Sequence, residues 1–297
     1  MSIEEPSRDP MREVTPLLIE VQSNLDQEFS LESLARQYGY SPYHFHRFFS
    51  RAVGETPKQH VERLRLERGA YKLAITDETV LGIALSVGFR NHETFTRAFR
   101  RTFGCSPRDY RRACKAAQDE WSQRKGGFRG EGCSLSELRF VSLPAMTLLA
   151  IRHHGAYAEL PVPFQDGDTL WNDLIDWARR NNAPCRPLAW LICYDDPTVT
   201  PPALQRVDAC VPAGGGVRPG GRVRRLDFAG GFYGGIEHAG PLSTIEQAYW
   251  TVADGIRRSR RYALAEGPPV QIYRTIHAGG DPAANVSEVY FPVRAAR

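Results

Sequence analysis

Apolar side chains recur at three- and four-residue intervals through the first 115 residues, and this spacing predicts a series of amphipathic helices. We predict helices over 13–29, 31–38, 42–53 and 58–75, and another that begins after Asn91. Ser30, Ser41 and Asn91 precede three of them, and Ser and Asn are favoured residues at helix N-termini. The N-terminal region is therefore predicted to be all-α.

This helical region contains an internal repeat. Gly39 returns 49 residues later as Gly88, and the offset then becomes 50 for a longer set of positions. That set pairs Phe45, Phe49, Gly54 and Pro57 with Phe95, Phe99, Gly104 and Pro107. A helical period with a glycine turn at the same place in both copies indicates two helix-turn-helix units.

In each copy one helix turns aromatic residues inward and a polar face outward. The outward residues are Tyr43, His46, Arg47 and Ser50 in the first copy and Glu93, Thr94, Arg97 and Arg101 in the second. Such side chains can hydrogen-bond to base edges in the major groove. An ordinary amphipathic helix with a polar surface explains either helix taken alone. The helix over 58–75 would span roughly 27 Å and suits two recognition helices about one DNA turn apart.

The C-terminal half has a different pattern, with short apolar runs that alternate with two helical segments. We predict strands over 146–152, 189–194, 207–211, 232–237, 270–276 and 288–293, and helices over 169–181 and 244–258. Ile151, His153 and Gly155 return 85 residues later, and Asp208 corresponds to Glu288 at an offset of 80. The prediction is an α+β domain with an antiparallel sheet and a pseudo-twofold βαββ repeat.

Composition and charge add to this picture of a multidomain chain. Its hydrophobic fraction of 42% and charged fraction of 24% are typical of globular proteins. No apolar run suffices to cross a bilayer and residues 1–10 form no signal peptide, so we expect a cytoplasmic protein without a membrane partner. The six cysteines include no CxxC pair, and we expect neither a metal centre nor a cofactor. Residues 30–117 carry 16 basic and 8 acidic side chains, which favours a phosphate-bearing partner.

The two helical copies resemble the DNA-binding domain of the AraC/XylS family of transcription regulators. The resemblance is carried by LESLARQYGYSPYHFHRFFSRAVGETP and VLGIALSVGFRNHETFTRAFRRTFGCSPRDYRR. It implies base contacts at the positions of Tyr43, His46 and Arg47, and of Glu93, Thr94 and Arg97. It also implies double-stranded promoter DNA and RNA polymerase as partners. We assign residues 1–117 to this domain and 118–135 to a polar, glycine-rich linker.

Residues 136–297 resemble the gyrase-inhibitor-like (GyrI-like) effector-binding domain. The matching stretches are HHGAYAEL, CYDDPTVTPP, QRVDACVPA, GGFYGGIEHAGPLSTIEQAYW and SEVYFPV. The resemblance implies a groove for small, often lipophilic and cationic molecules, with a functional glutamate at Glu288. The chain departs from the family pattern at Gln271, where an acidic residue is common, and at Arg260 and Arg261.

The predicted small-molecule site is centred on Glu288. Tyr290 shares its strand face, and a carboxylate among aromatic residues would take a cation as partner. Further aromatic walls are expected from Tyr157, Trp171, Trp190, Tyr194 and Tyr273, although aromatic residues of this kind also form cores.

Three functions follow from these predictions. The first is a DNA-binding transcription regulator with a small-molecule effector, which is not an enzyme. The second is a hydrolase that uses Glu288 with Tyr157 or Tyr290. The third is a DNA-binding protein whose C-terminal domain only contacts other proteins.

Overall fold

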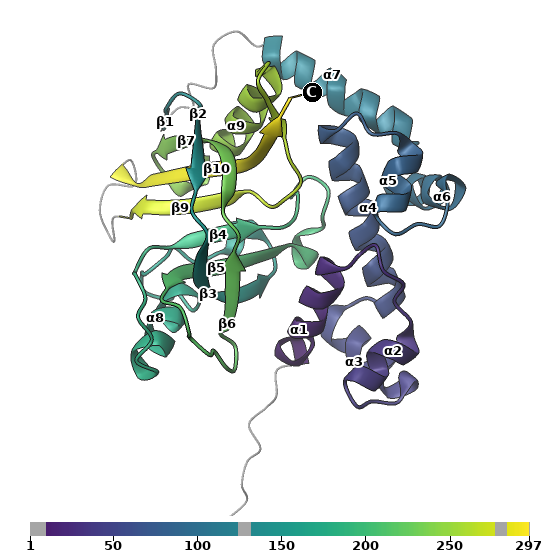
Figure 1. The fold of residues 1–297 in the computed structure, drawn as a ribbon, viewed down its shortest axis with the longest axis horizontal. Helices are drawn as coiled ribbons and strands as arrows, with labels where there is room; N and C mark the ends of the chain where they lie inside the picture. Colours follow the sequence, from purple (N-terminus) through teal and green to yellow (C-terminus); the bar gives the residue numbers. More distant parts are fainter. Residues whose placement is uncertain (1–9, 124–131, 277–283, 297) are drawn as a thin grey trace, which may run out of the picture. The chain divides into compact units, whose positions relative to one another are not determined.

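The computed structural model of the protein describes residues 10–123, 132–276 and 284–296 (Figure 1). The chain divides into two units, residues 1–116 and 117–297. The predicted linker over 118–135 needs a correction, because the last helix of the first unit continues to Gln123 and a strand begins at Ser134. Residues 124–131 of that segment lie outside the described residues. No helix in the described ranges is both long and apolar enough to span a bilayer.

The described part of the first unit consists of helices, as the hydrophobic period predicts. They are α1 (Pro10–Ser23), α2 (Leu31–Gln37), α3 (Pro42–Val53), α4 (Pro57–Ile75), α5 (Val80–Ser86), α6 (His92–Phe103) and α7 (Pro107–Gln123). Helix α4 runs between α2 and α3 at one end and α5 and α6 at the other (Figure 1). Helix α1 ends earlier than predicted, and the Leu25 and Gln27 carbonyls beyond it accept from the Arg65 guanidinium at 2.8 and 2.6 Å.

Helices α3 and α6 begin and end in the same way, which explains the sequence repeat. The Ser41 hydroxyl caps α3, and the Asn91 side chain caps α6 by accepting from the Thr94 N–H. Gly54 and Gly104 end these helices with φ of 82° and 72°, a left-handed conformation that glycine adopts at little cost.

The first unit has two apolar cores, one for each copy. The first joins α1 to the inner face of α3 and includes Leu17, Leu18, Phe45, Phe49 and Leu64. The second lies under α6 and includes Leu66, Leu73, Ile83, Phe95 and Phe99. Because α4 contributes Leu64 to one core and Leu66 to the other, it holds α3 and α6 on one rigid element.

The second unit is built on an antiparallel sheet. Its long strands are β3 (Met146–His154), β4 (Trp190–Cys193), β5 (Arg206–Ala213), β7 (Gly231–Ala239), β9 (Val270–Thr275) and β10 (Val286–Ala295). The order β7-β10-β9-β4-β5-β3 is symmetric about the β9–β4 pair, so the predicted pseudo-twofold repeat is present. The sequence pattern missed four strands, β1 (Ser134–Leu135), β2 (Arg139–Leu143), β6 (Arg224–Phe228) and β8 (Tyr262–Leu264).

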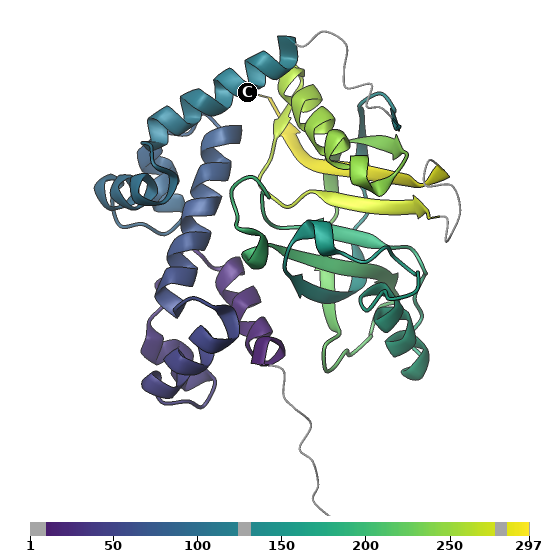
Figure 2. The ribbon, with the colours of Figure 1, turned by 180° about the vertical axis from the view of Figure 1, so that it is seen from behind.

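The two helices of this unit cover one face of the sheet. Helix α8 (Trp171–Arg180) packs on β3 and β5, and α9 (Glu246–Arg258) packs on β7 and β10 (Figure 2). Leu149, Ile151, Leu191 and Val207 form the core beneath α8. The opposite face has its own core around Leu148, Trp190, Ile192, Ile272 and Tyr290. Alternate residues of each strand therefore enter two different environments.

Candidate functional site

The outer face of α3 presents polar side chains next to one exposed aromatic ring. Tyr43 is 73% exposed, and the Arg47 Nη1 donates to its hydroxyl at 3.4 Å. The Arg47 guanidinium also lies 5.8 Å from the centre of that ring. His46 is half-buried on the same helix. The predicted contact at Ser50 is less favourable, because its hydroxyl oxygen is buried by the surrounding helix surface.

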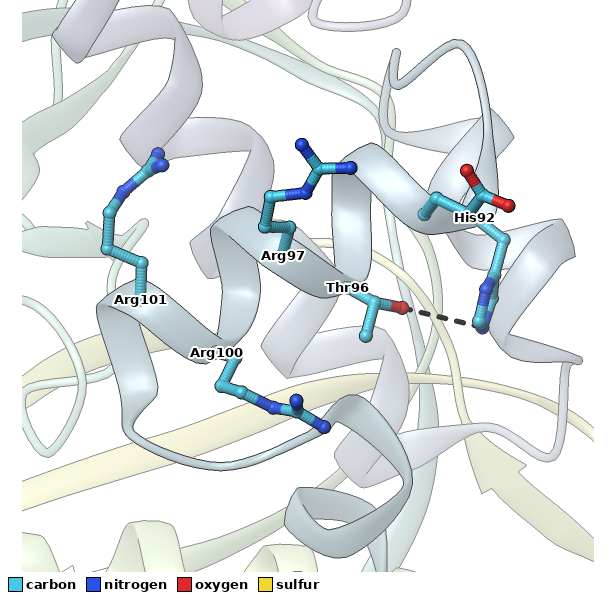
Figure 3. A pocket seen from close by; sticks show the side chains of 6 residues that line it. His92, Thr96, Arg97, Arg100 and Arg101 are labelled. Carbon is cyan, nitrogen blue, oxygen red and sulfur yellow. Dashed lines mark hydrogen bonds between the residues drawn. The ribbon is translucent and has the colours of Figure 1, made fainter.

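The outer face of α6 is more strongly basic. Figure 3 shows Arg97, Arg100 and Arg101 extending from this helix, with Thr96 hydrogen-bonded to His92 at 3.4 Å. Together with Glu93, these residues line an open hollow of about 510 Å³. Thr94 is exposed, but its hydroxyl bonds back to the Asn91 carbonyl at 3.1 Å. Arg101 forms an ion pair with Glu62 of α4, which directs it to the side of the face.

Sequence reasoning did not select His92, Thr96 or Arg100 for this surface. The helical period could have found Thr96 and Arg100, because they lie three or four residues from the selected positions Glu93 and Arg97.

Part of the positive charge of the first unit is structural. Arg63 bonds to Glu55 and to Glu67, and the His60 Nδ1 lies 2.6 Å from the Glu55 carboxylate. Burial alone would raise the pKa of Glu55, but the hydrogen bonds from His60 and Arg63 lower it to about 2. Arg111 donates to the Glu78 carbonyl at 2.6 Å. These groups hold the helices together, so the charge excess alone overstates the surface available to a nucleic acid.

In the second unit, Asp208 and Glu288 occupy corresponding positions of the two modules. Asp208 lies in β5, the third long strand of the first module, and Glu288 lies in β10, the third of the second. Asp208 pairs with Ile192 of β4, and Glu288 pairs with Ile272 of β9, the equivalent strand of the second module. The internal symmetry thus places one carboxylate in the same position of each module, as the offset of 80 predicts.

Asp208 is enclosed by cations and a phenol. Its carboxylate accepts from Arg152 at 2.7 and 3.1 Å and from the Tyr194 hydroxyl at 2.6 Å, and it also bonds Arg224. Burial by itself would raise the pKa of Asp208, but Arg152 and Arg224 lower it to about 2. Asp208 and the Arg152 side chain are almost fully buried and the Arg224 side chain is 24% exposed, so this ionic cluster is largely closed to solvent.

Glu288 has two arginine partners at a more open position. One carboxylate oxygen bonds Arg139 of β2, and the other accepts from the Arg274 Nε at 2.6 Å. Arg139 also donates to the Tyr290 hydroxyl at 3.0 Å. The side chain of Glu288 is 7% exposed, whereas those of Arg139 and Arg274 are 46% and 45% exposed.

Comparison with known proteins identifies both units. Residues 136–294 match the model of the GyrI-like small molecule binding domain. The chain belongs to the GyrI-like family. Residues 34–113 match a helix-turn-helix domain model, and this GyrI-like protein carries its DNA-binding domain in the AraC-type arrangement.

Several relatives and solved structures are similar to part of the chain. It is 34% identical to the transcriptional regulator Rob of Salmonella typhimurium over 145 residues, which are 46% of this chain and 47% of Rob. It is 34% identical to the transposon Tn10 TetD protein of Escherichia coli over 99 residues, which are 33% of this chain and 72% of TetD. The solved DNA-binding domain of AdpA in complex with a target DNA is 30% identical with a TM-score of 0.34, and the match covers 40% of this chain and 99% of that one. The chain thus spans about half the length of Rob.

The aromatic residues predicted to line the effector site of the GyrI-like domain are largely used in its interior. Trp171 is fully buried and its Nε1 donates to the Trp190 carbonyl at 3.2 Å, while Trp190 is 3% exposed. The Tyr157 hydroxyl donates to the Arg206 carbonyl at 2.9 Å. Tyr194 bonds Asp208. These four side chains stabilise the fold in this form, which is the alternative that their sequence pattern left open.

Glu288, Tyr290 and Tyr273 do not form one cluster. Tyr290 shares the face of Glu288, as the two-residue period predicts, and Tyr273 packs beneath α8 on the other face. Tyr157 also belongs to the α8 face, so the structure does not bring it to Glu288 as the hydrolase hypothesis requires. Sequence reasoning missed Arg139 and Arg274. The alternation from Ile272 could have found Arg274, whereas Arg139 lies in a strand that gave no clear signal.

No group of three or more His, Cys, Asp or Glu side chains within the described ranges is arranged to hold a metal ion.

Proposed function

We propose that this GyrI-like protein is a transcription regulator that binds double-stranded promoter DNA through α3 and α6 and responds to a small molecule bound by its second unit. The observation that supports this most directly is the pair of equivalent helices on α4, each with a polar outer face, a capped start and a glycine end. One chain then offers two major-groove elements on a single rigid support.

The base contacts that we propose are Tyr43, His46 and Arg47 on α3 and Glu93, Thr94 and Arg97 on α6. Arg can bind guanine with two hydrogen bonds, and Glu can accept from the cytosine amino group. We assign Arg101 to the phosphate backbone, because its ion pair with Glu62 holds it beside the face. RNA polymerase is the proposed protein partner, and the cytoplasm is the proposed site of action.

The similarity to Rob, which is named a transcriptional regulator, supports this proposal. The effector must bind the DNA-competent and DNA-incompetent states with different affinities, since otherwise it shifts no equilibrium.

The test begins with selection of a binding sequence from genomic fragments, followed by titration of variants on that sequence and on random DNA. Arg47→Ala and Arg97→Ala should each weaken binding to the selected sequence by about 1–3 kcal/mol and weaken random binding less. Arg12→Ala, on the exposed side of α1, is the matched control and should change neither. Equal losses on both DNAs would show phosphate contacts, and no selected sequence would contradict sequence-specific regulation.

A further inference from the structure

A small cavity lies at the end of β9 in the second unit, with a volume of about 160 Å³. Its walls are formed mainly by Pro163, Phe164, Pro187, Leu188, Tyr273 and Ile276. Arg274 and Gln165 add polar groups to the lining. An engineered apolar cavity of about 150 Å³ is large enough to bind benzene. The cavity therefore suits the apolar part of a compact molecule of that size.

One wall of the cavity is fixed before any ligand arrives. The Asp168 carboxylate accepts from the Phe164 N–H at 2.8 Å and also from the backbone N–H groups of Leu170, Trp171 and Asn172. Phe164 has a φ of 61°, which costs energy for a residue other than glycine. Because Asp168 holds this conformation by several bonds, the Phe164 side of the cavity is preorganised, which reduces the entropy lost on binding.

Arg274 brings positive charge to the cavity, whereas the Asp168 carboxylate at its Phe164 wall is already bound by four backbone N–H groups. Arg274 and Arg139 share a single carboxylate, that of Glu288, and both arginines are about half exposed. In the described part of the chain, Arg274 donates to Glu288 through Nε, so its terminal nitrogens are available to a second acceptor. A cationic ligand would have to displace these arginines from Glu288, because both oxygens of that carboxylate are already bound. An anion would supply an acceptor for the terminal nitrogens of Arg274, since its bond to Glu288 is made through Nε.

From this geometry we infer that the effector is a compact apolar anion, with its apolar part in the 160 Å³ cavity and its carboxylate on Arg274. The inference rests on the proposed function, whose effector it assigns to a chemical class. It replaces the expectation of a cation on Glu288: here Glu288 is the internal anion that competes with the ligand for Arg274.

Three probe molecules of nearly equal shape test which sign of ligand charge the cavity prefers. Benzoate, benzamide and benzamidine are an anion, a neutral molecule and a cation on the same ring. Binding to the full-length protein without DNA is measured by ligand-detected NMR and calorimetry. Benzoate should bind at least roughly tenfold more tightly than benzamide, because a hydrogen bond to a charged group contributes more than a neutral one. Benzamidine should bind most weakly.

Variants then test the assigned residues. Arg274→Gln should weaken benzoate binding roughly tenfold and leave benzamide unchanged. Arg225→Gln is the control, since Arg225 is similarly exposed and ion-paired but lies on β6. Leu188→Phe should fill the cavity and weaken all three probes. Glu288→Gln should tighten benzoate binding, because it removes the competing carboxylate.

Each outcome decides the inference. Tightest binding of benzamidine, with that binding lost in Glu288→Gln, would show a cation site and overturn the inference. Equal affinities for the three probes would show an apolar cavity without charge selection, and absence of binding would exclude the site. The proposed function fails separately, if the DNA titrations show no selected sequence. Benzoate binding that persists in that case would leave the ligand assignment intact and remove its regulatory role.

Discussion

The two modules of the GyrI-like domain place a carboxylate at the same position but treat it differently. Asp208 is fully buried, and its partner Arg152 is 2% exposed. Glu288 is also buried, but its partners Arg139 and Arg274 reach solvent. Asp208 is held by ion pairs inside its own module. Glu288 is held by two arginines whose side chains are accessible to a ligand.

This difference separates a structural role from a binding role within one repeated motif. A charge without access to solvent or ligand can contribute only to folding, because its ion pairs have no competitor. The arginines that pair with Glu288 are half exposed to water, so these pairs contribute less to stability than the buried pair of Asp208 with Arg152. A ligand can therefore replace an ion pair of Glu288 at a small cost in free energy. We expect ligand recognition in the second module and rigidity in the first.

Removing the carboxylate of Asp208 or of Glu288 should give the largest difference in stability between the two modules. Asp208→Asn leaves Arg152 buried without its counter-charge and should lower the free energy of unfolding of the second unit by about 3–5 kcal/mol. Glu288→Gln should lower it by about 1 kcal/mol or less. Urea unfolding combined with hydrogen exchange of residues 206–213 measures both effects in the second unit. Equal losses would remove the distinction between the two modules.

Acid should act through Asp208 in a defined window. Its folded-state pKa lies below the ordinary value of 3.8, at about 2, so its stabilisation is present above pH 3.8 and is lost as the pH falls toward 2. The loss is on the order of 2 kcal/mol. Hydrogen exchange of β5 between pH 5 and 2 should show it in the unmodified protein and much less in Asp208→Asn.

Glu55 provides the control for the acid experiment, because its pKa is also lowered to about 2 but it lies in the first unit. Glu55→Gln should flatten the acid response of α4 and leave that of β5 unchanged. A flattened β5 response in this variant would mean that the measured loss belongs to the first unit.

Removing the hydroxyl of the tyrosine beside each carboxylate should give the smallest difference in stability between the two modules. Burial raises the pKa of Tyr194, which keeps its phenol neutral as a donor to Asp208 at 2.6 Å. Tyr194→Phe should lower the free energy of unfolding by about 1.5–3 kcal/mol. Tyr290→Phe removes only an acceptor of the half-exposed Arg139 and should cost less than about 1 kcal/mol. Thermal unfolding of the two variants measures both losses. A larger loss in Tyr290→Phe than in Tyr194→Phe would contradict the assignment of Asp208 as enclosed and Glu288 as accessible.

Local patterns were enough to predict most of the fold. The range 42–53 was predicted as a helix and is one, because Ser41, Pro42 and Gly54 mark its ends chemically. The six long strands were found because their residues alternate between two packed environments. Strand β6 was missed, since its buried residues are few and its pairing with β3 comes from a distant part of the chain.

The candidate sites were predicted less completely. The outer faces of α3 and α6 follow from helical period, whereas the buried hydroxyl of Ser50 depends on its neighbours. The assigned DNA contacts stay predictions. Trp171 and Trp190 are core residues, and aromatic composition does not distinguish a core from a ligand wall. Arg139 reaches Glu288 across 149 residues of sequence, a pairing that no local pattern contains.

The sequence by itself determined the two helical copies, the pseudo-twofold sheet and the position of one acidic residue in each module. These features are encoded in caps, turns and hydrophobic period, which act over a few residues. The tertiary structure decided which acidic residue is enclosed and which is accessible, and that two arginines already neutralise Glu288. The physical reason is that burial and ion pairing depend on groups brought together from distant strands, and those distances exist only in the folded chain.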